Sequence, residues 1–233
     1  MKLLPALLLW SWALVASAAP RTPFQARCED SIGETLSVLT GVQNGFRIDN
    51  SVGYRSLTVM KGRARPGQYV LGLTRTESRV SINAGGRLLS DPASGYECIA
   101  PHIEVRLTYP PIVVYVSREF APGSCAYEEV LAHEMRHLNA YLDYLPKVEA
   151  KVRKALAQRF GSKPLYAPAG QAQGLLQREV DRGWMPYIKT EMAKVEALQA
   201  AIDSPQEYAR LGKVCGGEVQ LLLRPPPRRA KAS

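Results

Sequence analysis

The feature that most constrains the fold is a run without glycine or proline, Tyr127 to Tyr144, which contains HEMRH at positions 133–137. Its two histidines are four residues apart, and a glutamate follows the first. On an α-helix, residues four apart lie one above the other on the same face, so both imidazoles can reach a single ion. The run therefore predicts a helix that carries a metal site, with Glu134 beside the metal.

The flanking residues predict where this helix begins and ends. Pro122-Gly123-Ser124 has the composition of a turn followed by an N-cap, and Glu128 and Glu129 would lie near the positive end of the helix dipole. Pro146 is expected to close the helix just after Tyr144.

The HExxH pattern is that of zinc hydrolases. Zinc held by two imidazoles and one further ligand keeps an open position for water and lowers the pKa of that water. A carboxylate beside the metal can accept the proton as the water attacks a carbonyl. The sequence thus predicts His133 and His137 as zinc ligands, Glu134 as general base, and peptide hydrolysis as the reaction.

A third ligand is needed, and the favoured residue is Glu191. It falls within the apolar stripe of a helical stretch, 171–202, whose members are Ile188, Met192, Val195, Leu198 and Ile202. A buried carboxylate needs compensation, which a zinc ion would provide and which a lysine or arginine would provide equally well.

Several different residues could instead be the third ligand. Asp143 occupies the last position of the longer pattern HExxHxxGxxH/D, but Ala140 replaces its glycine, and on an unbroken helix Asp143 would point about 120° away from His137. His102 is the remaining histidine. Further candidates are Glu149, Glu179 and Asp181 as ligands, a site without a third protein ligand, and Tyr141 or Tyr187 as weak candidates for an oxyanion donor.

Residues 1–18 have the pattern of a cleavable signal peptide. Lys2 gives a positive start, Leu3 to Ala16 is apolar but too short to span a bilayer comfortably, and Ala16-Ser17-Ala18 is a small-x-small cleavage site. We therefore expect a secreted or periplasmic protein. No later segment is apolar for long enough to cross a membrane, so no transmembrane segment is expected.

Cysteine usage agrees with export. Four cysteines in an oxidising compartment predict two disulfides, and the favoured pairing is Cys98–Cys125 with Cys28–Cys215. The first pair flanks the predicted strands that lead into the metal helix. The second would tie together the two ends of the domain.

Length and charge limit the number of domains and the kinds of binding partner that can be expected. Residues 19–223 fit a single domain, followed by a basic tail at 224–233 that is expected to be disordered. The net charge of +9 suits solubility or attraction to anionic cell-envelope polymers. Nucleic acid is not expected as a partner, because no clustered basic helix or RNA-binding signature is present.

The predicted fold class is α+β, with a mainly antiparallel β-rich part at 21–120 and a helical part at 124–215. Strands are expected at 57–60, 68–74 and 79–83, followed by a strand pair, 102–109 and 112–120, around Pro110-Pro111. The second strand of the pair would either border the active-site cleft, where it could pair with an extended substrate, or be a buried structural strand. Helices are expected at 148–160, at 171–202 with a bend near Gly183 and Pro186, and from Ser204-Pro205; a last strand is expected at 218–223.

The HEMRH motif, together with Cys98 and Gly123-Ser124-Cys125, resembles the zincin metallopeptidases, in particular secreted bacterial proteins predicted to be zinc-dependent proteases. The likeness covers roughly residues 95–145. It implies a zinc cofactor, a peptide or protein substrate, and the ligand and base roles given above. Two different functions stay open beside this one, namely a zinc amidase acting on cell-wall peptides and a non-catalytic, metal-binding envelope assembly factor.

Overall fold

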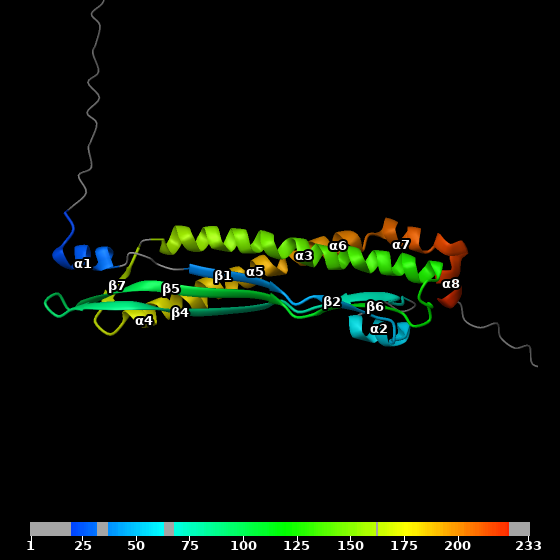
Figure 1. The fold of residues 1–233 in the computed structure, drawn as a ribbon, viewed down its shortest axis with the longest axis horizontal. Helices are drawn as coiled ribbons and strands as arrows, with labels where there is room; N and C mark the ends of the chain where they lie inside the picture. Colours follow the sequence, from blue (N-terminus) through cyan, green and yellow to red (C-terminus); the bar gives the residue numbers. More distant parts are fainter. Residues whose placement is uncertain (1–19, 32–36, 63–67, 162, 224–233) are drawn as a thin grey trace, which may run out of the picture.

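The computed structural model describes residues 20–31, 37–62, 68–161 and 163–223 (Figure 1). The predicted signal peptide and basic tail lie outside the described residues. The fold is α+β, as expected from the sequence. Figure 1 shows an elongated arrangement in which one long helix, α3 (Cys125–Phe160), runs above strands that follow its length.

Helix α3 has 36 residues and is therefore about 54 Å long. It begins as predicted, because Ser124 is the N-cap and its side chain accepts a hydrogen bond from the Tyr127 amide at 3.2 Å. The prediction that Pro146 ends the helix is wrong, and the two expected helices are one. Proline lacks the N–H that would bond to the Leu142 carbonyl. The side-chain amide nitrogen of Gln43, Nε2, donates to that oxygen instead, at 2.8 Å.

The strands form two sheets that lie end to end. In the first sheet, β5 (Tyr96–Tyr109) is central, with β4 (Arg79–Asp91) antiparallel on one side and β1 (Ser37–Gln43) parallel on the other; β7 (Leu165–Pro168) pairs with the start of β5. In the second sheet, β6 (Ile112–Val116) lies between parallel β2 (Phe46–Asp49) and antiparallel β3 (Gly72–Arg75). Strands β2, β6 and β3 of the second sheet continue the lines of β1, β5 and β4, respectively, past short breaks (Figure 1).

The β part is mainly antiparallel, as expected, because β3 with β6, β4 with β5 and β5 with β7 are antiparallel pairs. Two parallel pairs, β1 with β5 and β2 with β6, complete the sheets. Of the two roles expected for β6, the structure shows the buried structural strand, because β2 and β3 flank both of its edges and leave none for a further strand. The edge strand beside α3 is β3 instead.

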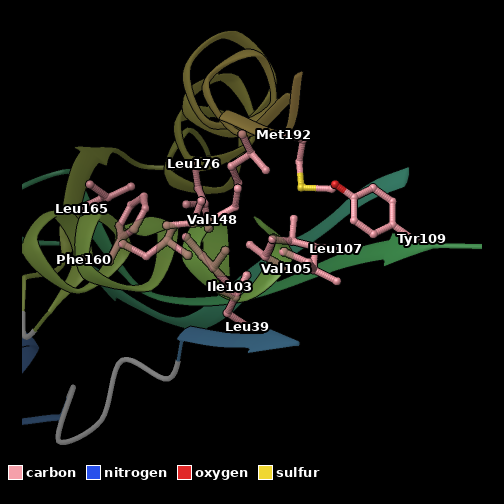
Figure 2. Packing of buried hydrophobic residues seen from close by; sticks show 14 of the residues in the cluster. Leu39, Ile103, Val105, Leu107, Tyr109, Val148, Phe160, Leu165, Leu176 and Met192 are labelled. Carbon is pink, nitrogen blue, oxygen red and sulfur yellow. The ribbon is translucent and has the colours of Figure 1, made fainter. Parts of the chain in front are cut away.

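The main core lies between the first sheet and the helices α3, α4 (Ala172–Glu179) and α5 (Met185–Ala193). Figure 2 shows Ile103, Val105 and Leu107 of β5 facing Val148 and the other helical side chains. In the second half of α3, four apolar side chains spaced four residues apart are all buried: Val148, Val152, Leu156 and Phe160. The stripe predicted for 171–202 fails at Leu198, which is 43% exposed.

Two predicted strands are helices. Residues 57–60 belong to α2 (Tyr54–Lys61), which buries only Leu57. The Tyr54 amide at its first turn donates to the Glu119 carboxylate at 3.1 Å, so a contact far along the chain supports the helix start. The predicted terminal strand is α8 (Glu218–Leu223). Its apolar run has no neighbouring strand among the described residues.

The chain after α5 forms a series of short helices. A π-helical turn, η1 (Val180–Trp184), precedes α5 where the bend was expected. Helices α6 (Val195–Ile202) and α7 (Pro205–Leu211) follow, then η2 (Val214–Gly217). Helix α6 packs against α3.

Two disulfides are present as predicted, but the favoured pairing is wrong. Cys28 of α1 (Pro23–Ser31) pairs with Cys98 of β5, and Cys125 at the start of α3 pairs with Cys215 of η2. The reason is the direction of the elements, because β5 begins and α3 begins at opposite ends of the molecule (Figure 1). Among the described residues, no helix combines the length and apolar character that a membrane crossing requires.

Candidate metal centre

The HEMRH segment lies in the N-terminal half of α3, and its three chemical residues are buried. His133, Glu134 and His137 are 5%, 4% and 7% exposed. Because the helix is regular here, the two imidazoles lie on one face, and their Nε2 atoms are 3.2 Å apart. The structure therefore brings together the three residues that the motif predicts.

A carboxylate completes the group, and it belongs to Asp203. Its Oδ1 atom lies 3.2 Å from Nε2 of His137 and 3.3 Å from Nε2 of His133. These three residues form the only cluster among the described residues whose ligand atoms converge in the manner of a metal site. Burial raises the pKa of the Asp203 carboxyl, but hydrogen bonds from His133, His137 and Tyr208 outweigh burial and lower it, so the group is ionised at neutral pH.

The spacing of the three ligand atoms fits a tetrahedral ion. With zinc–ligand distances of about 2.0–2.1 Å and tetrahedral angles, neighbouring ligand atoms lie about 3.3–3.4 Å apart. The observed edges of 3.2, 3.2 and 3.3 Å match one face of such a tetrahedron. His133, His137 and Asp203 could thus hold a metal ion and leave its fourth position open.

Side chains spaced four residues apart along α6 and α7 contact this site. Gln199, Asp203 and Glu207 lie opposite the α3 residues in reverse order, so that Gln199 meets His137, Glu207 meets His133, and Asp203 lies between. Asp203 ends α6, and Ser204 caps α7 by accepting from the Glu207 amide at 3.2 Å. The corner between two short helices therefore places the third ligand.

A second layer of polar groups surrounds the ligands. Oε1 of Gln199 lies 2.5 Å from Nδ1 of His137, and Oε1 of Glu207 lies 3.4 Å from Nδ1 of His133. Lys61 of α2 approaches the other oxygen of Asp203 at 3.5 Å, which leaves Oδ1 directed at the imidazoles. Such outer partners orient metal ligands and tune their basicity.

No protein-family model, curated protein or solved structure matches this chain. Its function therefore has to be inferred from the side chains themselves.

Glu134 is held beside the ligand group by strand β3. Oγ1 of Thr74 lies 2.9 Å from its carboxylate and 2.9 Å from its carbonyl oxygen. Gly72 lies against the same side chain, and a Cβ at that position would be only 2.6 Å from Oε1 of Glu134. Burial raises the pKa of the Glu134 carboxyl, with the nearby imidazoles and Thr74 opposing the rise. A carboxyl with a raised pKa beside two imidazoles is suited to proton transfer.

Glu191 was the favoured third ligand, and the structure does not bring it to the imidazoles. Its side chain is buried, as expected, but the compensating charges are Lys151 at 2.8 Å and Lys194 at 2.6 Å. Lys151 lies almost four turns beyond His137 on α3, a distance of about 21 Å along the helix axis. The two lysines explain why this carboxylate is buried without a metal.

The remaining candidate ligands also lie outside the group of His133, His137 and Asp203. Asp143 is exposed on the continuous helix, and His102 pairs with Glu104 on the open face of β5. Ion pairs and hydrogen bonds occupy the remaining acids: Glu149 with Arg153, Glu179 with Arg159, and Asp181 with Gln177. Tyr141 contacts Tyr109, and Tyr187 contacts Trp184. The tyrosine beside the site is Tyr208, whose ring centroid is 6.2 Å from that of His133.

Asp203 was missed because sequence reasoning favours carboxylates that lie within helical stripes. Asp203 is the last residue before the Ser204-Pro205 cap, where a helical pattern breaks. The available signal was its position directly after the stripe residue Ile202. A residue at the corner between two helices can reach the site without belonging to the apolar stripe of either helix.

Proposed function

We propose that this chain is a secreted or periplasmic zinc-dependent metallopeptidase. The observation that carries the proposal is the triangle of His133, His137 and Asp203, at tetrahedral spacing, beside the buried carboxylate of Glu134. Two disulfides are compatible with an oxidising compartment outside the cytosol.

The roles follow from the chemistry of each group. His133, His137 and Asp203 would hold the zinc ion, which would supply a Lewis acid for the substrate carbonyl and for the attacking water. Glu134 accepts the proton from the attacking water and returns it to the leaving amine. Thr74 donates to the Glu134 carboxylate and keeps it in place for both transfers.

Strand β3 supports a peptide substrate. The Ser117 amide bonds to the Leu71 carbonyl, so in the antiparallel ladder the backbone groups of Leu71 and Leu73 face β6, while those of Gly72 and Thr74 face outward. No strand in the described part of the chain pairs with that outer edge. An extended peptide can hydrogen-bond there, close to Glu134.

The test compares two variants of the purified, zinc-loaded protein. Glu134→Gln should keep zinc and lose peptide hydrolysis by at least about 100-fold, because it removes only the proton acceptor. His133→Ala should lose the metal. Glu128→Gln, an exposed glutamate in the first turn of the same helix, is the matched control and should behave as wild type.

Zinc content by elemental analysis and cleavage of a mixed peptide library are the two measurements. Folded wild type that takes up no zinc would overturn the metal site, and hydrolysis by Glu134→Gln at the wild-type rate would overturn the assigned base. Digestion of cell-wall muropeptides by the same samples tests whether the chain is an amidase. Zinc uptake without hydrolysis of either substrate would favour a binding protein over a peptidase.

A further inference from the structure

We infer that the disulfide between Cys125 and Cys215 is a redox switch that holds α7 against α3 and releases it on reduction. The two disulfides of the chain differ in burial. Cys28 and Cys98 are 0% and 1% exposed, whereas Cys125 is exposed and Cys215 is half-buried. A thiolate in solution therefore reaches Cys125 directly, but it reaches the pair of Cys28 and Cys98 only after the surrounding structure opens.

The backbone at Cys215 favours opening of this disulfide. Cys215 has φ 54° and ψ 37°, which is the left-handed region, and Gly216 and Gly217 follow it with φ 64° and 82°. Among the described residues, Cys215 is the only non-glycine residue with a positive φ. A residue with a Cβ is less stable in this region than glycine. Once the covalent link is broken, the chain at η2 can relax away from this conformation.

The disulfide fixes the far end of the helix that follows Asp203. Asp203 ends α6, Ser204 caps α7, and Cys215 lies in η2 directly after α7. The partner, Cys125, is the first residue of α3. Figure 1 shows α7 and α8 beside this end of α3. The link between the cysteines therefore clamps α7 to the helix that carries the two imidazoles.

The other contacts that hold α7 on α3 are weak. Glu207 pairs with Arg136, and Arg210 pairs with Glu129 at 2.7 Å, but the arginine side chains are 46% and 45% exposed. Ion pairs with exposed partners contribute little, and salt screens them. Leu211 is the one buried residue of α7. A helix of seven residues is not stable alone, so α7 depends on the disulfide for its position.

Opening is local, because the main core lies elsewhere. No residue of α7, η2 or α8 belongs to the main core that the described residues form between the first sheet and α3, α4 and α5. Val219 of α8 packs in a separate, smaller cluster with Val116 and Phe120. Reduction therefore loosens α7 and carries Asp203 and Glu207 away from the imidazoles, while the rest of the domain stays folded.

The reductant is a dithiol, and the exchange balances. One thiolate of the dithiol attacks the Cys125 sulfur, forms a mixed disulfide and releases Cys215 as a thiolate, which takes up a proton. The second thiol of the dithiol attacks the mixed disulfide and releases Cys125. Two electrons and two protons pass to the protein, and the dithiol becomes a disulfide. The reverse exchange restores the link.

The first measurement is the rate at which each disulfide opens in the wild-type protein. Dithiothreitol is added, samples are alkylated at intervals, and mass spectrometry of the peptides locates the modified cysteines. We expect Cys125 and Cys215 to be alkylated at least about 10-fold faster than Cys28 and Cys98, which serve as the internal control. Equal rates for the two disulfides would overturn the inference, and this result depends on no variant.

The second measurement uses the double variant Cys125→Ser with Cys215→Ser, without a reductant that would itself bind zinc. Amide hydrogen exchange in α7 should be at least about 10-fold faster than in wild type, with α4 and α5 unchanged. Zinc affinity, from competition with a chelator, should fall about 10-fold, because only molecules with α7 docked present Asp203 to the ion.

The effect on zinc rests on the proposed metal site, whereas selective reduction and the release of α7 do not, so the two can fail separately. Faster exchange in α7 of the double variant, beside a wild type that binds no zinc, would support the switch while refuting the metal site. Unchanged exchange in α7 would overturn the switch, and so would fast exchange throughout the double variant, because opening would then not be local. Unchanged zinc affinity beside faster exchange would overturn its link to the site.

Discussion

Replacing Gly72 with alanine should displace the proposed general base while leaving the metal ligands in place. A Cβ at Gly72 would lie 2.6 Å from Oε1 of Glu134, 2.7 Å from its Cγ and 2.8 Å from Cγ1 of Val130. Since ordinary contacts begin at 3.4 Å, these atoms must move away by roughly 0.6–0.8 Å. A misplacement of about 1 Å in a catalytic group costs on the order of 100-fold in rate, and overpacking costs about 1–3 kcal/mol of stability.

The assay combines three measurements on Gly72→Ala: kcat/KM for peptide hydrolysis, zinc affinity, and the free energy of unfolding. We expect a fall in kcat/KM of roughly 30- to 100-fold, a loss of about 1–3 kcal/mol, and unchanged zinc affinity. Gly85→Ala on β4 is the matched control, because a Cβ there meets no atom within 4 Å and its backbone is not in the left-handed region. A variant of Gly72 that is as stable and as active as Gly85→Ala would refute the reasoning.

Three further predictions concern the metal, the buried carboxylate and the disulfide. Asp203→Ala should lower zinc affinity by at least about 100-fold, whereas Glu191→Ala should leave it unchanged; competition with a chelator measures both. The lysine partners hold the pKa of the Glu191 carboxyl in the folded state below its ordinary 4.5. They therefore stabilise the folded state at pH values above 4.5, and this stabilisation is lost as the pH falls through the lower folded-state pKa. The stability difference between wild type and Glu191→Gln, about 1 kcal/mol at pH 7, should therefore shrink below about pH 4 in denaturant titrations; a difference independent of pH would contradict it. Replacing Cys125 and Cys215 together by serine should cost about 2–5 kcal/mol, because their 90-residue separation closes a long loop; equal unfolding midpoints would contradict this.

The half of the candidate site that lies on α3 could be predicted from sequence because its geometry is local. The spacing of His133 and His137 fixes their common face once the segment is helical, and Ser124 supplies a recognisable start. No distant contact is needed to place these groups. The structure accordingly brings together His133, Glu134 and His137 as the motif predicts.

The third ligand depends on tertiary structure, and sequence reasoning chose wrongly. The burial of Glu191 was predicted from its stripe, but burial alone does not tell whether a lysine or a metal compensates the charge. Asp203 reaches His137 across a separation of 66 residues. Apart from its position directly after the stripe residue Ile202, nothing in the local pattern distinguishes Asp203 from an ordinary helix end.

The errors in the fold have the same origin. A proline inside a helix usually ends it, because it leaves a carbonyl without a hydrogen-bond partner. At Pro146 the side chain of Gln43 in β1 donates to that carbonyl, which belongs to Leu142, and only the tertiary structure brings Gln43 there. Four cysteines allow three pairings, and the choice depends on which ends of β5 and α3 lie together. In both cases the deciding contact joins segments far apart in the chain.

The register between two helical segments is what defines the site. Along α3 and along the α6–α7 corner, the polar groups repeat every four residues, so one alignment matches Gln199 with His137 and Glu207 with His133 at once. A slip of four residues, about 6 Å, would separate both pairs and carry Asp203 out of the triangle. The Ser204 cap and the disulfide between Cys125 and Cys215 restrain that slip from either side of Glu207. The HExxH motif therefore fixes two candidate ligands by itself, while the third candidate is placed by elements whose sequence carries no metal-binding signature.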